Sequence, residues 1–238
     1  MKTINKFLLE YAPDHPEDIV IINKFYPHGL REIDVYNYYL LRKNELIKWI
    51  NGRMIAFLIR IDKNKTVLIR NQKGKPIYLT EKNFEDLING RMNVIYVTHP
   101  ELTNYFIIDI DVGPNLGMKQ CKLALEILLH SKLNLKRYEA INSSDRGIHL
   151  IGYVSIPNNI DLLRKELELE LKKITDKLNT KSNIKFLVNT KGRHPNTINF
   201  DLSSMYPNSL HIAKYSLTKE FLICNDISKG IKKVKQQL

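Results

Sequence analysis

Hydrophobic residues recur along the chain with two periods, one typical of helices and one of strands. The clearest helical period runs from residue 160 to residue 178, where apolar side chains follow one another at steps of three and four. They are Ile160, Leu163, Leu167, Leu171, Ile174 and Leu178. Charged residues fill the rest of the circumference, so this segment is predicted to be a helix with one face in the core. Weaker helical spacing predicts helices over residues 33–50, 81–88 and 116–133, and Asn51-Gly52 is expected to end the first.

Short β-prone runs lie between these helices and predict strands. They cover residues 54–60, 66–70, 76–79, 94–97, 105–113, 137–141, 148–156, 184–188, 197–200 and 221–224. The first three are separated by lysine-rich turns and are expected to pair antiparallel. Strands and helices do not alternate strictly, which favours an α+β fold with mixed or antiparallel sheets flanked by helices. Residues 226–238 are expected to form a basic helix or tail.

Two acidic residues end the apolar run at residues 105–113. Asp109 and Asp111 are two positions apart, so on a strand both side chains point to the same face. Like charges so close are costly unless a cation neutralises them, and hard ions such as Mg²⁺ or Mn²⁺ prefer oxygen ligands. The pair is therefore a candidate metal site. The alternative is a turn or helix cap at the end of a strand.

Composition and charge narrow the classes of partner. The chain has 238 residues, 43% of them hydrophobic, which suits one large domain or two small lobes around one cleft. Its 37 Lys and Arg against 25 Asp and Glu give a formal net charge of +12, which favours nucleic acid first and an anionic membrane second. No apolar stretch approaches the roughly 18 residues of a membrane span, and the N-terminus lacks a signal-like apolar region, so we expect a cytoplasmic protein with no membrane partner. Cys121 and Cys224 are expected to be free, buried thiols.

A polar turn at residues 143–149 is the second candidate site. It reads Ser-Ser-Asp-Arg-Gly-Ile-His and leads into a predicted strand. Hydroxyl groups, the cation of Arg146 and the imidazole of His149 could all be directed at phosphate oxygens, with Ser143 at the start of the turn. The alternative is a hairpin turn followed by a satisfied core histidine.

A third acid, Asp201, follows the apolar run at residues 197–200. If its strand lies beside that of Asp109, three carboxylates could hold two divalent ions about 4 Å apart. Such a pair stabilises the attacking 3′-oxygen and the leaving pyrophosphate in nucleotidyl transfer. Taken by itself, Asp201 would more often be a turn acid or a cap.

These motifs together resemble the archaeo-eukaryotic primase superfamily, most closely the polymerase domain that accompanies bacterial and archaeal end-joining DNA ligases. The family's Asp-x-Asp is matched by Asp109 and Asp111, and its Ser-Gly-Gly-Lys-Gly-Leu-His by residues 143–149. Its third motif, an Asp followed by a Pro-Tyr-Ser-Val-like segment, is matched by Asp201 and residues 214–217. Residues 25–39 and 51–53 resemble the family's N-terminal motifs, so the resemblance spans roughly residues 20–225.

The chain departs from the family pattern at several positions. Ser144 and Asp145 replace two glycines and add a negative charge beside the expected triphosphate. Arg31 stands where the family has a lysine that contacts a 5′-phosphate, and arginine can also bind phosphate. A second alignment of the third motif uses residues 206–211, which resemble a segment of replicative primases but have no Asp at the expected distance upstream. The cysteine-rich zinc element of many replicative primases is absent.

The resemblance implies a polymerase or primase that adds NTPs or dNTPs to a primer on a DNA template, in DNA repair or replication. Asp109, Asp111 and Asp201 would hold two Mg²⁺ or Mn²⁺ ions. Ser143, Arg146, His149 and Lys214 would bind the triphosphate. The resemblance implies a single catalytic domain with two lobes, residues 1–100 and residues 101–238, and the second lobe would carry the metal-binding acids. The N-terminal lobe would contact DNA through Arg31, Arg53, Lys73 and Lys75, and a DNA ligase, a helicase or a primase large subunit could be a partner.

Three other functions remain as alternatives. A replicative-type primase catalytic subunit would use the same acids to make RNA primers. A metal-dependent glycosyltransferase would explain the Asp-x-Asp, but neither the net charge of +12 nor the turn at residues 143–149. An inactive nucleic-acid-binding protein would not need all three acids.

Overall fold

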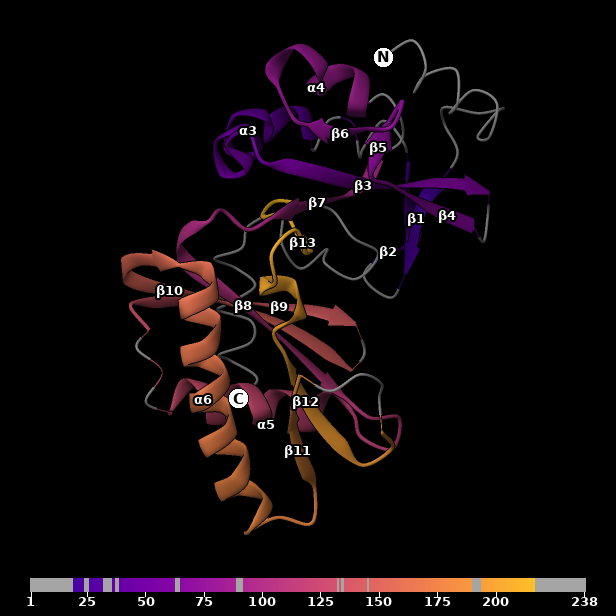
Figure 1. The fold of residues 1–238 in the computed structure, drawn as a ribbon. Helices are drawn as coiled ribbons and strands as arrows, with labels where there is room; N and C mark the ends of the chain where they lie inside the picture. Colours follow the sequence, from indigo (N-terminus) through magenta and orange to yellow (C-terminus); the bar gives the residue numbers. More distant parts are fainter. Residues whose placement is uncertain are drawn as a thin grey trace. The chain divides into compact units, whose positions relative to one another are not determined.

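A computed structural model of the chain describes residues 19–23, 26–31, 36, 39–62, 65–88, 92–131, 133, 135–144, 146–189 and 194–216 (Figure 1). The chain divides into two compact units, residues 1–98 with 210–222 and residues 99–209 with 223–238. The strand predicted at residues 221–224, the helix or tail at 226–238 and Cys224 lie outside the described residues. Within the described part of the chain, no helix combines the length and the apolar character that a membrane crossing needs.

In the part of the chain that the structure describes, the first unit combines antiparallel strands with short helices. Its elements are β1 (Ile19–Asn23), β2 (Tyr26–Arg31), α3 (Lys43–Ile50), β3 (Met54–Asp62), β4 (Lys65–Ile69), β5 (Asn71–Gln72), β6 (Lys75–Tyr78), α4 (Glu81–Ile88), β7 (Met92–Thr98) and β13 (Leu210–Ile212). The main sheet runs β13-β7-β3-β6-β5, with β4 also paired to β3, and β1 pairs with β2. Buried residues of α3, α4 and the central strands form its core, including Leu46, Phe57, Phe84 and Ile95.

The segment predicted as a helix over residues 33–50 is helical at its described residues, Tyr36, 39–41 and 43–50, with one interruption. Residues 39–41 are helical, Arg42 is in a turn, and α3 begins at Lys43. The predicted end is confirmed, because Asn51 and Gly52 both adopt left-handed backbone angles, with φ of 45° and 70°. Gly and Asn tolerate this conformation, which stops a helix.

A tight hairpin joins β5 to β6 and explains one of the lysine-rich turns. Gln72 pairs with Lys75, and the two residues between them, Lys73 and Gly74, have φ of 51° and 72°. Two successive residues with positive φ are typical of the hairpin turns that match the twist of the flanking strands. Lys73 and Lys75 are exposed there.

The described residues of the second unit form a mixed sheet with helices packed on it. Its elements are β8 (Leu102–Val112), α5 (Met118–Leu129), β9 (Arg137–Ser144), β10 (Gly147–Asn159), α6 (Ile160–Asn179), β11 (Lys185–Val188), β12 (Thr197–Asp201) and the short 3₁₀ helix η1 (Ser203–Met205). The strand order is β11-β12-β8-β10-β9. β11 and β12 are parallel, and the other neighbouring strands are antiparallel.

The two faces of this sheet differ because the residues of β8 alternate in character. Ile108, Ile110 and Val112 are buried in the core with residues of α5 and α6, among them Leu125 and Leu167. In Figure 1 both helices lie along the second unit's sheet. Successive side chains of a strand point to opposite faces, so Asp109 and Asp111 lie on the face away from this core. The α+β fold predicted from the sequence is confirmed.

Gly113 lets the segment before β12 approach the end of β8. Its N–H donates to the carbonyl of Thr197 at 2.8 Å. A side chain at this position would place a Cβ only 1.8 Å from the backbone oxygen of His194. The glycine therefore allows a close backbone contact that helps to set β12 beside β8.

Candidate active site

A row of three polar residues crosses the sheet of the second unit. Asp109 of β8 is paired with Asp201 of β12 on one side and with His149 of β10 on the other. Residues directly opposite one another on antiparallel strands share a face, so all three side chains belong to the same face. His149 Nε2 lies 3.2 Å from Asp109 Oδ1, and the two side chains are 18% and 35% exposed. The expectation that Asp201 lies beside Asp109 is confirmed.

The next row along the same face contains Asp111. Its partners are Asn199 of β12 and Gly147 of β10. Asn199 is buried and was not among the predicted site residues. The signal was present, because Asn199 is two positions before Asp201 and a period of two places both side chains on one face.

The carboxylates already have partners inside the protein. Asp201 Oδ1 accepts a hydrogen bond from the backbone N–H of Ser203 at 2.6 Å, which is the turn-acid arrangement considered for this residue. Asp109 Oδ1 faces His149. Among the described residues, no three His, Cys, Asp or Glu side chains are grouped so that they could hold a metal ion. The oxygen chemistry of the three acids and their common face fit Mg²⁺ or Mn²⁺, and metal binding there stays a prediction.

The turn at residues 143–149 is a β-hairpin. Ser144 at the end of β9 pairs with Gly147 at the start of β10, and the carbonyl of Arg146 accepts a hydrogen bond from Val112 N–H at 3.0 Å. The hairpin therefore adjoins the end of β8 that carries Asp111. Asp145 and the side chain of Ser143 lie outside the described part, and phosphate binding by Ser143, Arg146 and His149 stays a prediction.

Lys214 belongs to the first unit, whereas Asp201 belongs to the second. Its ammonium lies 5.8 Å from the centre of the Trp49 ring and 5.4 Å from that of Tyr215. His211 of β13 is buried, with Nδ1 2.9 Å from the carbonyl of Ile212. Binding of the triphosphate by Lys214 stays a prediction.

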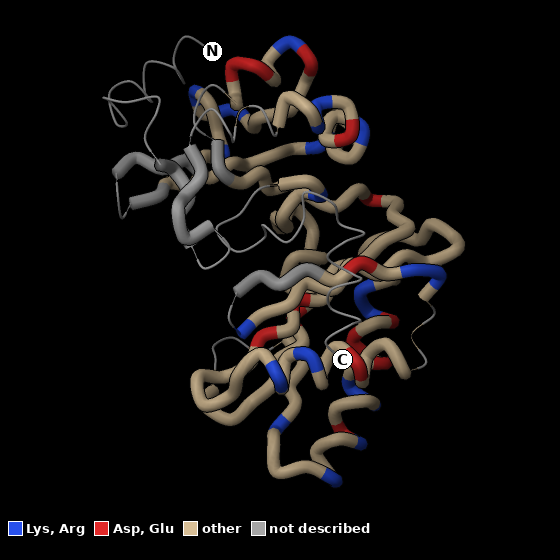
Figure 2. The backbone as a smooth tube through the Cα atoms, turned by 180° about the vertical axis from the view of Figure 1, so that it is seen from behind, with Lys and Arg blue, Asp and Glu red and all other residues tan. Residues whose placement is uncertain are grey.

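The residues expected to contact DNA differ in how the structure uses them. Lys73 and Lys75 are exposed on the β5–β6 hairpin. Arg31 is the last residue of β2, and its side chain lies outside the described part. Figure 2 shows Lys and Arg on both units among the described residues, so no single element collects the basic charge.

Arg53 has a structural role at the end of α3. Its guanidinium donates to the carbonyls of Ile50 at 2.9 Å and Thr98 at 2.6 Å, and also to that of Trp49. The bonds to Ile50 and Trp49 satisfy carbonyl groups that a helix leaves open at its C-terminus, and the bond to Thr98 links the guanidinium to the end of β7. A contact between Arg53 and DNA stays a prediction.

A comparison with solved structures finds the same architecture in a polymerase domain. The chain is similar to the polymerase domain from Mycobacterium tuberculosis Ligase D in complex with DNA, with a TM-score of 0.66 over 86% of this chain and 82% of that chain. The fold is shared. Sequence identity is 14%, and neither the protein-family models nor the curated proteins give a match. The predicted resemblance is thus confirmed for the fold, at an identity too low to carry over a reaction.

Proposed function

We propose that this protein is a metal-dependent nucleotidyltransferase that adds NTPs or dNTPs to a primer 3′ end on a DNA template. The observation that carries the proposal is the cross-strand row Asp201–Asp109–His149 with Asp111 on the same face. The fold shared with a polymerase domain that was solved with DNA supports it. Repair by end joining is the proposed setting, and synthesis of RNA primers by a replicative-type primase is the alternative.

Asp109, Asp111 and Asp201 would hold two Mg²⁺ or Mn²⁺ ions. When bound, the ions would supply charge neutralisation at the triphosphate and activation of the 3′-hydroxyl. His149 would keep one oxygen of Asp109 oriented and donate a hydrogen bond to a phosphate oxygen, joined by Ser143 and Arg146, with Lys214 as an addition. Phosphoryl transfer depends mainly on positioning and electrostatic stabilisation, so side chains on a rigid sheet suit it.

The contacts with nucleic acid would come from the first unit. Lys73 and Lys75 would contact the phosphate backbone, and Arg53 would add a further contact to it. Arg31 is the candidate for binding a 5′-phosphate. The formal net charge of +12 is consistent with a polyanionic partner. A DNA ligase, a helicase or a primase large subunit would be a protein partner of such an enzyme.

The test is incorporation of labelled nucleotide with Mg²⁺ or Mn²⁺. A primed template and a bare single-stranded template are offered NTPs and dNTPs in parallel, which separates extension from primer synthesis. Asp109→Ala should abolish incorporation while DNA affinity is unchanged, because a carboxylate of the metal site is lost and the basic residues are retained. Asp176→Ala is the matched control, since it removes the same charge from an exposed position of α6.

Two results would count against the proposal. One is extension by Asp109→Ala at the wild-type rate with Mn²⁺, which would remove the acids from the reaction. The other is absence of metal-dependent incorporation by the wild type on every template.

A further inference from the structure

Asn189 holds the backbone on both sides of Asp201. Its N–H donates to the carbonyl of Phe200 at 2.9 Å, and its side-chain oxygen accepts from the N–H of Leu202 at 2.7 Å. Successive residues of a strand direct their backbone N–H and C=O groups to opposite edges of the strand. The groups of Phe200 and Leu202 therefore point away from the edge to which those of Asp201 point. Asp201 is paired with Asp109 on the β8 side, so Asn189 secures it from the other side.

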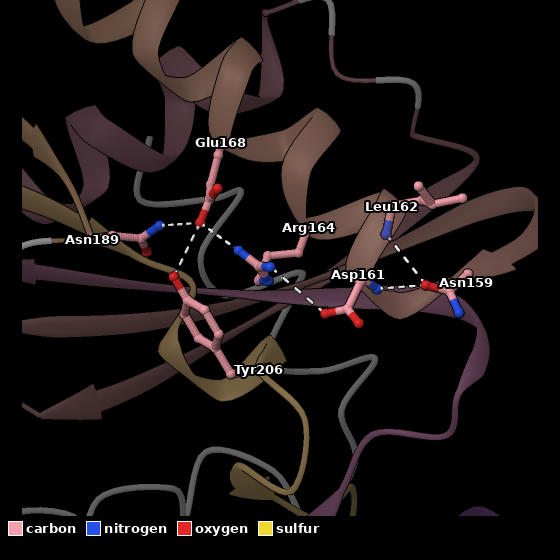
Figure 3. Close-up of polar contacts among 7 residues, drawn as sticks. All are labelled: Asn159, Asp161, Leu162, Arg164, Glu168, Asn189 and Tyr206. Carbon is pink, nitrogen blue, oxygen red and sulfur yellow. Dashed lines mark hydrogen bonds and ion pairs between the residues drawn. The ribbon is translucent and has the colours of Figure 1, made fainter.

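Glu168 of α6 orients the amide of Asn189. The side-chain nitrogen of Asn189 donates to Glu168 Oε1 at 2.8 Å, as drawn in Figure 3. An amide has one oxygen acceptor and one nitrogen donor, so only one orientation satisfies both Leu202 and Glu168. Asn189 has a left-handed φ of 50°, which asparagine tolerates better than most residues.

Glu168 is in turn fixed by two further donors. Its Oε1 lies 2.9 Å from a guanidinium nitrogen of Arg164 and 3.4 Å from the hydroxyl of Tyr206. Arg164 is 9% exposed, and its guanidinium carbon lies 4.1 Å from the centre of the Tyr206 ring. A guanidinium nitrogen of Arg164 also lies 3.6 Å from a carboxylate oxygen of Asp161. Figure 3 shows the side chains of Arg164, Tyr206 and Asn189 converging on the Glu168 carboxylate. Helix α6 is thereby tied to the segments before and after β12.

We propose that Asn189, oriented by Glu168, is the positioning residue that holds Asp201 for metal binding. The inference rests on the proposed function, because it gives Asn189 a role in the site of the three acids. Loss of a partner that orients a metal ligand typically costs about 10- to 100-fold in metal affinity or activity. Asn189 touches neither substrate nor metal in this role and acts through the backbone of Asp201.

The chain offers a matched control in Asn179. Its side chain brackets Phe186 at the other end of β11, donating to the carbonyl at 3.0 Å and accepting from the N–H at 2.6 Å. Asn179 thus also holds a strand residue through two hydrogen bonds, made here by the side chain alone, and it lies away from Asp201. Asn179→Ala therefore removes a comparable structural contact without touching the acids.

The test measures Mn²⁺ binding directly, by the loss of the free-ion electron paramagnetic resonance signal, alongside thermal melting. The variant of choice is Asn189→Gly, because glycine adopts positive φ without strain and keeps the backbone bond to Phe200. It should weaken Mn²⁺ binding by about 10- to 100-fold, and raised Mn²⁺ should restore incorporation. Asn179→Ala should lower the melting temperature with Mn²⁺ affinity unchanged.

A second variant keeps the proposal open to failure if Asn189→Gly does not fold. Glu168→Gln retains an oxygen acceptor for Asn189 and Arg164 but loses the charge, so we expect a smaller loss of Mn²⁺ affinity in the same direction. Two results would overturn the positioning role. One is that Glu168→Gln binds Mn²⁺ as tightly as the wild type. The other is that Asn189→Gly and Asn179→Ala lose the same amount of Mn²⁺ affinity. Asp109→Ala separates the two proposals, since wild-type Mn²⁺ affinity in that variant overturns the proposed function itself.

Discussion

The thiol of Cys121 lies on the core side of β8, beneath the strand that carries the two acids. It is buried, and Sγ donates to the carbonyl of Ile110 at 3.3 Å. Burial raises the pKa of Cys121 strongly, and the negative charges of Asp111 and then Asp109 raise it further. The sequence prediction of a free, buried thiol is confirmed at this position.

The raised pKa of Cys121 predicts a dependence of stability on pH. Below the ordinary thiol pKa of roughly 8.5, both the folded and the unfolded thiol are protonated. Above it the unfolded thiol loses its proton first, so the free energy of unfolding should fall, by up to about 1.4 kcal/mol per pH unit. Urea unfolding of wild type and Cys121→Ala between pH 8 and 10.5 checks this. The stability difference between them should shrink as pH rises, and a constant difference would contradict the assignment.

The acids of the site could be predicted from the sequence, but their neighbours could not. Asp109 and Asp111 are two positions apart on an apolar run, so their common face follows from the period of a strand. The place of Asp201 opposite Asp109 needed a pairing between residues 92 positions apart, which the family resemblance supplied and the structure bears out. Asn189 and Glu168 carry no local signal, since an asparagine after a strand and a glutamate on a charged helix are ordinary there.

The side chain of Asn159 caps the N-terminus of helix α6. The side-chain oxygen of Asn159 accepts from the N–H groups of Asp161 at 2.9 Å and Leu162 at 3.4 Å, as Figure 3 shows. The first turn of a helix leaves its N–H groups without partners, and a side-chain acceptor satisfies them. Because α6 carries Arg164 and Glu168, the cap also supports the contacts around Asp201.

Replacing this cap should lower stability by a modest, defined amount. Asn159→Ala is expected to reduce the free energy of unfolding by about 1 kcal/mol, measured by chemical denaturation. Asn159→Asp keeps an oxygen acceptor and should stay close to wild type. An alanine variant as stable as the aspartate variant would mean that the side chain contributes nothing to the helix.

Element boundaries were predictable where one physical signal dominated. The stripe from Ile160 to Leu178 gave α6 nearly to the residue, and α4 was found over its full length, residues 81–88. The helix expected over residues 33–50 is interrupted at Arg42, because spacing alone does not reveal a turn there. Strand β13 was missed since its three residues become a strand only by pairing with β7, more than 100 positions earlier.

At the scale of the whole molecule, the chain leaves the first unit and later returns to it. Residues 210–216 follow Asp201 closely in sequence, yet β13 pairs with β7 of the first unit, and Ser216 accepts a hydrogen bond from Ile95 N–H at 2.7 Å. The prediction divided the chain once, into residues 1–100 and 101–238, and so assigned residues 210–216 to the second lobe. Sequence order alone does not show that these residues belong with the first unit. The motif that joins Asp201 to Lys214 therefore runs from one unit into the other.

The charge of the molecule leads to a prediction about DNA binding that separates a specific contact from general attraction. Each phosphate that a lysine or arginine neutralises adds about 0.9 to the slope of log affinity against log salt for duplex DNA. If the β5–β6 hairpin contacts the backbone, Lys73→Ala with Lys75→Ala should lower that slope by about 1.8. Fluorescence anisotropy of labelled duplex DNA across a range of salt concentrations measures it.

The control for this prediction must remove the same charge from another place. Lys165→Ala with Lys172→Ala does so on exposed positions of α6 and, like the hairpin pair, takes two charges from a formal net charge of +12. Attraction by net charge alone would make both double variants weaken DNA binding equally, with equal slopes. A contact at the hairpin would change the slope only in the Lys73 and Lys75 variant, because counterions are released only where a phosphate is neutralised. Equal slopes would therefore place the DNA contacts away from this hairpin.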